Sequence, residues 1–395
     1  MIYLDNAATT RISPYVFEAM TPYLTEEYGN AGSIYGLGRR AAEAIAKARK
    51  QVADFIGAEP EQIIFTSGGT ESNNLAILGC KNYLESKGKY KVITSPIEHD
   101  SVLKAFMALE DTTSPYIKDG FDTFYLDVYK DGCIDLDSLK EIIHDNEDIG
   151  IVSAMAVNNE LGTVNPIVDI GDMCKSYDIL FHTDCVQAAG TIPLDVNKFP
   201  CDLMSISSHK IHGPKGVGAL FVRDRTVLSA VINGGTYQEF GLRGGTENVA
   251  GIVGFGMACE MASKGLNKYS KTVTHYKQCF YKKLIDDLKS KNNEACLSVN
   301  GISPKSTGKI LSLTFDGVDS ETLVLMMDAR GVCVSAGSAC QSHESHPSHV
   351  LKGIGMNDDK ARCTIRISFS EFNTIKEIED AAIILADCVS SLRGM

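Results

Sequence analysis

Several features that the chain lacks bound the kind of protein it is. It has no apolar stretch long enough to cross a bilayer and no leader-like segment at its amino terminus. It has no Cys-x-x-Cys pair, and its 12 cysteines are scattered singly, which argues against a disulfide framework. No cluster of Lys and Arg offsets the formal net charge of -12. We therefore expect a cytoplasmic protein that contacts neither membrane nor nucleic acid directly.

The order of apolar patterns predicts an α/β fold with two domains. From about residue 63 to residue 222, β-branched runs of strand length alternate with helix-period segments, a pattern typical of a mostly parallel sheet flanked by helices. Beyond Gly234 and Gly235 a long helical pattern follows, and then short strands alternate with helices. We expect a large domain over residues 15–258 and a smaller α+β domain made of residues 1–14 and 259–395. The expected strands are 63–65, 92–94, 151–157, 179–181, 203–206, 218–222, 310–315 and 363–369, and the expected long helix is 248–291.

Polar residues follow most of the expected strands of the large domain. His99, Asn159, Asp184 and the pair His209-Lys210 each lie at or just beyond the carboxyl end of a strand. Open α/β sheets bind their ligands at that edge. The pattern therefore predicts one site to which several strand ends contribute.

Asp184 and Lys210 have the residue types that pyridoxal phosphate chemistry needs. A lysine amine holds the cofactor aldehyde as a Schiff base, and a carboxylate keeps the pyridine nitrogen protonated so that the ring accepts electrons. Asp184 is followed by Gln187 and, one strand later, by Ser207-Ser208-His209-Lys210. Aspartates and lysines also end strands in many proteins without such a role, so the pair needs support from the rest of the chain.

A glycine-rich turn could hold the phosphate of such a cofactor. Gly68, Gly69 and Thr70 lie between an expected strand and a helical run, where backbone amides can approach an anion. The turn matches neither a Walker sequence nor a dinucleotide fingerprint, and the alternative is a plain turn and helix cap. Ser207 and His209, which flank the lysine turn, could add donors to the same anion.

Three further side chains are candidates for the same site. His99 could stack on a cofactor ring and move protons, although a single histidine after a strand is usually structural. Asn159 offers an amide to the cofactor or to a substrate carboxylate, unless it only forms a turn with Gly162. Arg366 alternates with apolar residues on an expected strand and is either an exposed residue or a bidentate clamp for a carboxylate.

Cys340 differs from the other cysteines in its surroundings. Small residues flank it, and such flanks leave a thiol unshielded and its backbone free to move, as a travelling thiol requires. Cys333, in an apolar run, and the other ten cysteines are interpreted as structural. His343, His346 and His349 recur nearby at intervals of three, but their loop lacks the tight ligand pairing of zinc sites, and we expect no metal.

Taken together, these motifs resemble those of the cysteine desulfurases, which are class V aminotransferase-like enzymes of PLP fold type I. The resemblance runs nearly end to end and rests on residues 3–10, 66–74, 208–216 and 243–248 and on the Cys340 loop. It implies the following roles: Lys210 as the Schiff-base lysine, Asp184 as the ring-nitrogen partner, Gln187 and Asn159 on the side of the ring hydroxyl, and Gly69, Thr70, Ser207 and His209 at the phosphate.

The resemblance also implies an activity and partners. L-cysteine would bind through Arg366 and Asn159, Lys210 or His99 would move its α-proton, and Cys340 would take the sulfur as a persulfide, with release of L-alanine. Thr246 would reach the phosphate of a neighbouring subunit in a homodimer. The loop around Cys340 resembles the long-loop group, closest to the nitrogenase-associated type, which implies direct donation to a sulfur-acceptor protein such as an iron–sulfur scaffold.

Two points stay open at the level of sequence. The chain ends at Met395, without the longer tail that housekeeping members use to dock a scaffold, so the acceptor is undetermined. A selenocysteine lyase or a class V aminotransferase would keep Asp184, Lys210 and Arg366. Transamination would not need a sulfur-accepting thiol, and Cys340 therefore favours the desulfurase.

Overall fold

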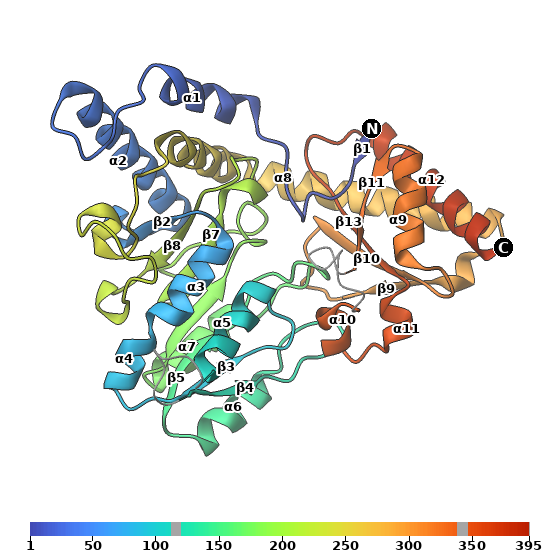
Figure 1. Cartoon of the computed structure of the whole chain (residues 1–395). Coiled ribbons are helices and arrows are strands. Elements are labelled where there is room, and N and C mark those ends of the chain that lie inside the picture. Colours follow the sequence, from blue (N-terminus) through green and yellow to red (C-terminus); the bar gives the residue numbers. More distant parts are fainter. Residues whose placement is uncertain (112–119, 338–346, 395) are drawn as a thin grey trace.

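The computed structural model describes residues 1–111, 120–337 and 347–394, and its larger part is built on a seven-stranded sheet (Figure 1). The strand order is β2-β8-β7-β6-β5-β3-β4; β8 runs antiparallel to β2 and β7, and the other neighbours are parallel. The prediction of a mostly parallel sheet is confirmed. The strands are β2 Ile63–Thr66, β3 Lys91–Thr94, β4 Asp122–Tyr125, β5 Ile149–Ser153, β6 Leu180–Asp184, β7 Leu203–Ser207 and β8 Gly218–Val222.

Helices cover both faces of this sheet, which explains why its central strands are buried along almost their whole length. Alternate residues of β8 enter two different cores: Phe221 belongs to the core formed with α1, α2, α6, α7 and the first turns of α8, whereas Leu220 belongs to the core formed with α3, α4 and α5. The helices of this part are α1 Pro14–Thr25, α2 Gly36–Ile56, α3 Gly69–Gly79, α4 Lys81–Ser86, α5 Asp100–Glu110, α6 Leu136–Asp145 and α7 Ile167–Ser176.

The smaller part contains an antiparallel sheet in the order β12-β13-β10-β9 and a parallel pair of β1 with β11. Its core gathers apolar residues of these strands and of α9 and α12. The strands are β1 Ile2–Tyr3, β9 Leu297–Asn300, β10 Ile310–Phe315, β11 Val332–Cys333, β12 Ser335–Ala336 and β13 Thr364–Ser368. The remaining helices are α8 Val249–Ser290, α9 Ser320–Ala329, α10 His349–Gly353, α11 Asp358–Ala361 and α12 Ile375–Arg393.

Helix α8 joins the two parts and matches the predicted long helix (Figure 1). Asn248 caps its start, because the side chain of Asn248 accepts a hydrogen bond from the Gly251 amide. Phe255 packs in the core beneath the large sheet, whereas Phe280 packs in the core of the smaller part. The division of the chain after residue 258 stays a prediction.

The predicted strands differ from the structure in two ways: one was predicted too long, and β1, β4, β9, β11 and β12 were not predicted. The strand expected over 151–157 is β5, which begins at Ile149 and ends at Ser153. The apolar pattern continues past its end because Ala154, Ala156 and Val157 are buried in the core outside the sheet. Strand β4 was not predicted, because this edge strand is only partly buried and has no apolar run.

Within the described ranges, no helix has the length and hydropathy that crossing a bilayer would require.

Candidate active site

A cavity of about 450 Å³ opens where strands of the large sheet end, between that sheet and the smaller part. Ten of the twelve residues predicted for the site line it, so the expectation that separate strand ends meet in one place fits the geometry. They are Gly69, Thr70, His99, Asn159, Asp184, Gln187, Ser207, His209, Lys210 and Arg366. Thr246 is exposed and is not among the lining residues, and Cys340 lies outside the described residues.

Lys210 projects from a short 3₁₀ turn, Ser208–Lys210, that directly follows β7. Its amine donates hydrogen bonds to the backbone carbonyls of Ala7, at 2.6 Å, and Ala8, at 2.8 Å. These two alanines also line the cavity. The amino-terminal segment thus forms part of the cavity wall, a role that the sequence did not indicate.

Asp184 ends β6 and is held by two donors. One carboxylate oxygen accepts from the Asn73 amide nitrogen at 2.7 Å, and the other accepts from the backbone N–H of Val186 at 2.9 Å. The Asn73 amide also donates to Ser101 Oγ at 2.8 Å. Asp184 is 6% exposed, so these bonds fix a carboxylate that faces the cavity. Asn73 was not predicted as a site residue, although it lies within residues 66–74, one of the segments on which the family resemblance rests.

The start of α3 offers donors for an anion. Gly68 precedes the helix without a capping side chain, so amides of the first turn have no side-chain acceptor. Ser207 Oγ is buried beside this turn and has no hydrogen-bond partner among the described residues. A Cβ atom on Gly69 would lie only 2.7 Å from Cγ2 of Val186, so this position has no room for a larger residue.

The two histidines of the cavity have lowered pKa values. Burial lowers the pKa of His209 to about 4, and the nearby ammonium of Lys210 adds to this effect. Burial also lowers the pKa of His99, against the opposing effect of the Asp184 carboxylate. His99 Nδ1 accepts from the Ser101 backbone N–H at 3.1 Å. Both imidazoles are therefore neutral near pH 7, the form in which one ring nitrogen can accept a proton.

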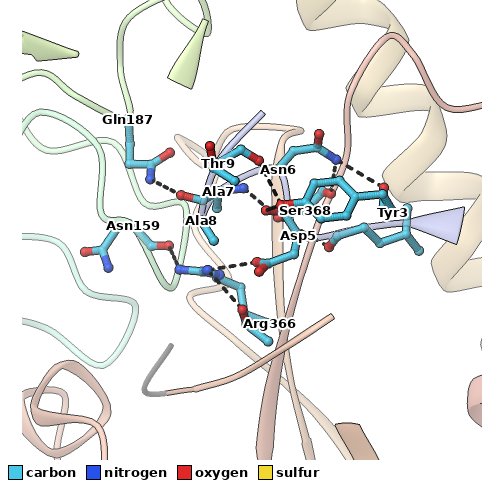
Figure 2. A network of polar contacts seen from close by, with 12 residues as sticks. Tyr3, Asp5, Asn6, Ala7, Ala8, Thr9, Asn159, Gln187, Arg366 and Ser368 are labelled. Atoms are coloured by element: carbon cyan, nitrogen blue, oxygen red, sulfur yellow. Dashed lines mark hydrogen bonds and ion pairs between the residues drawn. The ribbon is translucent and has the colours of Figure 1, made fainter. Parts of the chain in front are cut away.

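Arg366 reaches the cavity from β13 of the smaller part (Figure 2). It is 3% exposed, so the alternative of an exposed strand residue is wrong. Its guanidinium donates to the Asp5 carboxylate at 3.0 Å and to the backbone carbonyl of Asn159 at 2.9 Å. The Arg366 Nε, the Asn159 side-chain oxygen and the Gln187 side-chain oxygen are buried without partners in the described chain.

Comparison with known proteins places the chain in a family. The model of the aminotransferase class-V family matches residues 2–380. A cysteine desulfurase IscS of Dictyoglomus turgidum is 41% identical over 392 residues, which cover 99% of this chain and 95% of that protein. This chain belongs to the cysteine desulfurases. A solved structure of a NifS-like protein matches with a TM-score of 0.86 and 34% identity, covering all of both chains. The structure of SspA in complex with cysteine matches with a TM-score of 0.76 and 35% identity over 95% of this chain.

The class-V aminotransferases use pyridoxal phosphate, and the cavity of this cysteine desulfurase suits that group. The unpartnered Ser207 hydroxyl and the first turn of α3 match a phosphate, and the fixed Asp184 carboxylate matches a protonated ring nitrogen. The unpartnered Gln187 and Asn159 oxygens could accept hydrogen bonds from a ligand. The closer relationship to the nitrogenase-associated type stays a prediction.

Proposed function

We propose that this protein takes sulfur from L-cysteine, releases L-alanine and carries the sulfur on Cys340 for iron–sulfur cluster or other thio-cofactor biosynthesis. The observation that best supports this proposal is the convergence of Lys210, Asp184 and the unpartnered Ser207 in one cavity of a chain that belongs to the cysteine desulfurases. Pyridoxal phosphate bound there would supply the electron sink that stabilises negative charge on the substrate carbons.

Each end of the cofactor has matching residues in the cavity. Lys210 would hold the aldehyde carbon, and Asp184 would keep a proton on the ring nitrogen. Gln187 and Asn159 would lie on the side of the ring oxygen. The phosphate would bind to Gly69, Thr70, Ser207 and His209, where the amides at the start of α3 meet the Ser207 hydroxyl.

The substrate carboxylate would bind Arg366 and the Asn159 amide. A guanidinium has five N–H donors, and Arg366 uses its terminal nitrogens on Asp5, on the Asn159 carbonyl and, at 3.4 Å, on Ser335 Oγ. A bidentate contact with substrate therefore requires these contacts to be shared or exchanged. Lys210 or the neutral His99 would move the α-proton, since both line the cavity.

Sulfur would pass to the Cys340 thiolate, which attacks the substrate sulfur. The carbon–sulfur bond breaks, a sulfur–sulfur bond forms, and the carbon that lost sulfur gains a proton, so that cysteine and the enzyme thiol become alanine and an enzyme persulfide. Gly337 and Ser348 lie on either side of the segment that holds Cys340. The Gly337 amide donates a hydrogen bond to the Thr364 carbonyl at 2.9 Å, and the Ser348 hydroxyl donates one to the Glu160 carboxylate at 2.6 Å. These two hydrogen bonds attach both neighbours of the Cys340 segment to the rest of the protein.

We further propose a homodimer in which Thr246 of each subunit reaches the phosphate of its partner's cofactor. Thr246 is exposed and does not line the cavity of its own chain, as such an exchange requires. Large apolar side chains are also exposed on and just after α1, which supports burial of this surface against a second copy. They are Tyr15, Phe17, Leu24, Tyr28, Ile34 and Tyr35. A sulfur-acceptor protein would then receive the persulfide sulfur.

The decisive assay measures alanine and sulfide formed from L-cysteine in the presence of a reducing thiol. The proposal predicts equal amounts from the wild-type protein and neither product from Cys340→Ala, although this variant keeps its bound cofactor. Cys333→Ala is the matched control and should keep its activity. If the wild-type protein binds cofactor but releases neither product, the proposal fails, and selenocysteine and amino-donor substrates should be tested instead.

A further inference from the structure

A second lysine lies buried beneath the turn that carries Lys210. Lys309 directly precedes β10 and is 1% exposed, yet it does not line the cavity. Its backbone is fixed because its carbonyl accepts from the Phe369 N–H at 2.8 Å, which continues the pairing of β10 with β13. Lysine is rarely buried to this extent without a paired carboxylate, so the position calls for a physical explanation.

The amine of Lys309 contacts the backbone of the Lys210 turn. Lys309 Nζ lies 3.4 Å from the backbone carbonyl oxygen of Lys210 and can donate a hydrogen bond to it. Within the described ranges, no carboxylate forms an ion pair with Lys309. The charged groups that face it are the cations Lys210 and Arg366, and its own charge acts in turn on His209 and His212.

These surroundings make the protonation of the two lysines interdependent. Burial, followed by the charges of Lys210 and Arg366, lowers the pKa of Lys309 to about 7. Repulsion between two ammonium groups is mutual, so a proton on Lys309 also disfavours a proton on Lys210. Arg366 is already paired with Asp5, which offsets part of its charge.

We propose that Lys309 is a positioning residue for Lys210: it holds the carbonyl of the Lys210 turn and, while it is itself protonated, its charge favours the unprotonated amine of Lys210. The inference rests on the proposed function, because it concerns how Lys210 takes up the cofactor. Lys309 acts through another residue, since it is not among the residues that line the cavity.

The chemistry of Schiff-base formation explains why this matters. An unprotonated amine adds its lone pair to the aldehyde carbon; a carbon–nitrogen bond forms, and the carbonyl oxygen leaves as water with the two amine hydrogens. An ammonium group has no lone pair and does not react. A neighbouring cation is one of the ways in which proteins keep a lysine nucleophilic near neutral pH.

Other groups around Lys210 act differently. His99 and His209 are neutral near pH 7, because burial lowers their pKa values. Asp184 lies across the same cavity, and its negative charge favours a proton on nearby bases. The cation of Lys309 opposes that effect from beneath the turn.

The test measures how fast Lys210 reacts with pyridoxal phosphate at different pH values. Full-length protein is freed of cofactor, pyridoxal phosphate is added, and Schiff-base formation is followed by absorbance; borohydride reduction and mass spectrometry then locate the modified lysine. Lys309→Met should slow the reaction about fivefold at pH 6 to 7, where wild-type Lys309 is at least half protonated, and should leave the rate unchanged above about pH 9, where Lys309 is neutral. Lys309→Arg should keep the faster reaction at pH 6 to 7, because it keeps the charge.

Lys277 provides the matched control. It is a largely buried lysine of α8 whose amine donates to the Thr307 carbonyl at 3.2 Å and whose pKa burial lowers to about 8. Lys277→Met should leave the rate unchanged over the same pH range, because the Lys277 amine contacts the Thr307 carbonyl and not the Lys210 turn.

The possible outcomes separate the inference from the proposed function. A wild-type rate at pH 6 to 7 in a folded Lys309→Met protein would overturn the inference. If this variant does not fold, as judged by circular dichroism, Lys309→Gln replaces it under the same criterion. If the wild-type protein forms no Schiff base, or forms it at a lysine other than Lys210, the proposed function fails.

Discussion

The two walls of the cavity differ in how completely their polar groups are satisfied. On the wall formed by the large sheet, Asp184 is fixed by two donors, while Ser207 and the start of α3 have unused hydrogen-bonding capacity. On the opposite wall, both terminal nitrogens of Arg366 are already bonded, one to the Asn159 carbonyl and one to Asp5, and only its Nε has no partner in the described chain (Figure 2). The first wall is built to receive a group without rearrangement. The second wall must share or exchange partners when a substrate binds.

The largest expected effect comes from Lys210, which follows a strand of the large sheet and whose amine contacts the amino-terminal segment across the cavity. Lys210→Ala should abolish covalent attachment of the cofactor and all turnover, because no other lysine lines the described cavity. Borohydride reduction followed by mass spectrometry measures the attachment. Lys215→Ala changes an exposed lysine of the same segment and should keep both attachment and turnover. A cofactor that stays covalently bound in Lys210→Ala would refute the assignment.

A change on the second wall should affect substrate and spare the cofactor. Arg366→Lys keeps the charge but loses the planar fork, so we expect a loss of about 2 kcal/mol in cysteine binding, seen as a KM raised roughly thirtyfold. Steady-state kinetics and the cofactor content together measure the split. Arg362→Lys, at an exposed position just before β13, is the control. An unchanged KM in Arg366→Lys would remove Arg366 from the substrate site.

A change on the first wall should do the reverse. Gly69→Ala forces a methyl group against Val186, so the start of α3 must shift, and we expect cofactor affinity to fall about tenfold, or roughly 1.4 kcal/mol. Equilibrium titration with pyridoxal phosphate measures the affinity. The double change Gly69→Ala with Val186→Ala removes the clash and should recover most of the loss. If the double variant binds no better than Gly69→Ala, the steric explanation is wrong.

The smallest expected effect concerns a carboxyl group just before His99. Glu98 is fully buried; one of its oxygens accepts from Ser95 Oγ and the Met155 N–H, both at 2.8 Å, and burial raises its pKa to about 8. Between the ordinary carboxyl pKa and about pH 8, the folded protein therefore binds more protons at Glu98 than the unfolded chain does. This contribution makes stability fall as pH rises through that window.

Glu98→Gln should remove that part of the pH dependence. Thermal unfolding of wild type and variant between pH 5 and pH 9 measures it, and the variant should gain stability relative to wild type by about 1 kcal/mol toward the alkaline end. Glu379→Gln, at an exposed position of α12, should not change the slope. Parallel curves for wild type and Glu98→Gln would contradict the raised pKa.

The sequence predicted the first wall better than the second. Asp184, Ser207 and Lys210 each follow a strand of the parallel sheet, and the geometry of such sheets brings strand ends together. The ion pair of Asp5 with Arg366 joins residues 361 positions apart, and no local pattern indicates such a contact. Ala7 and Ala8 were likewise missed as lining residues, because alanines carry no chemical signal.

Lys309 shows a second limit of sequence reasoning. It directly precedes an apolar strand, where a lysine would ordinarily mark the point at which the chain reaches solvent. Its burial beneath the Lys210 turn depends on the packing of β10 and β13 and of the 3₁₀ turn, which are far apart in the sequence. Only the assembled structure relates the two lysines.

The most direct test of the account follows the sulfur through a single turnover. Wild-type protein loaded with cofactor is given L-cysteine labelled in its sulfur, without a reducing thiol, and mass spectrometry locates the label. The account predicts one labelled sulfur on Cys340, formed together with one alanine. It also predicts no label on the protein in Lys210→Ala. Labelled sulfur on a different cysteine, or alanine formed without any labelled protein sulfur, would contradict it.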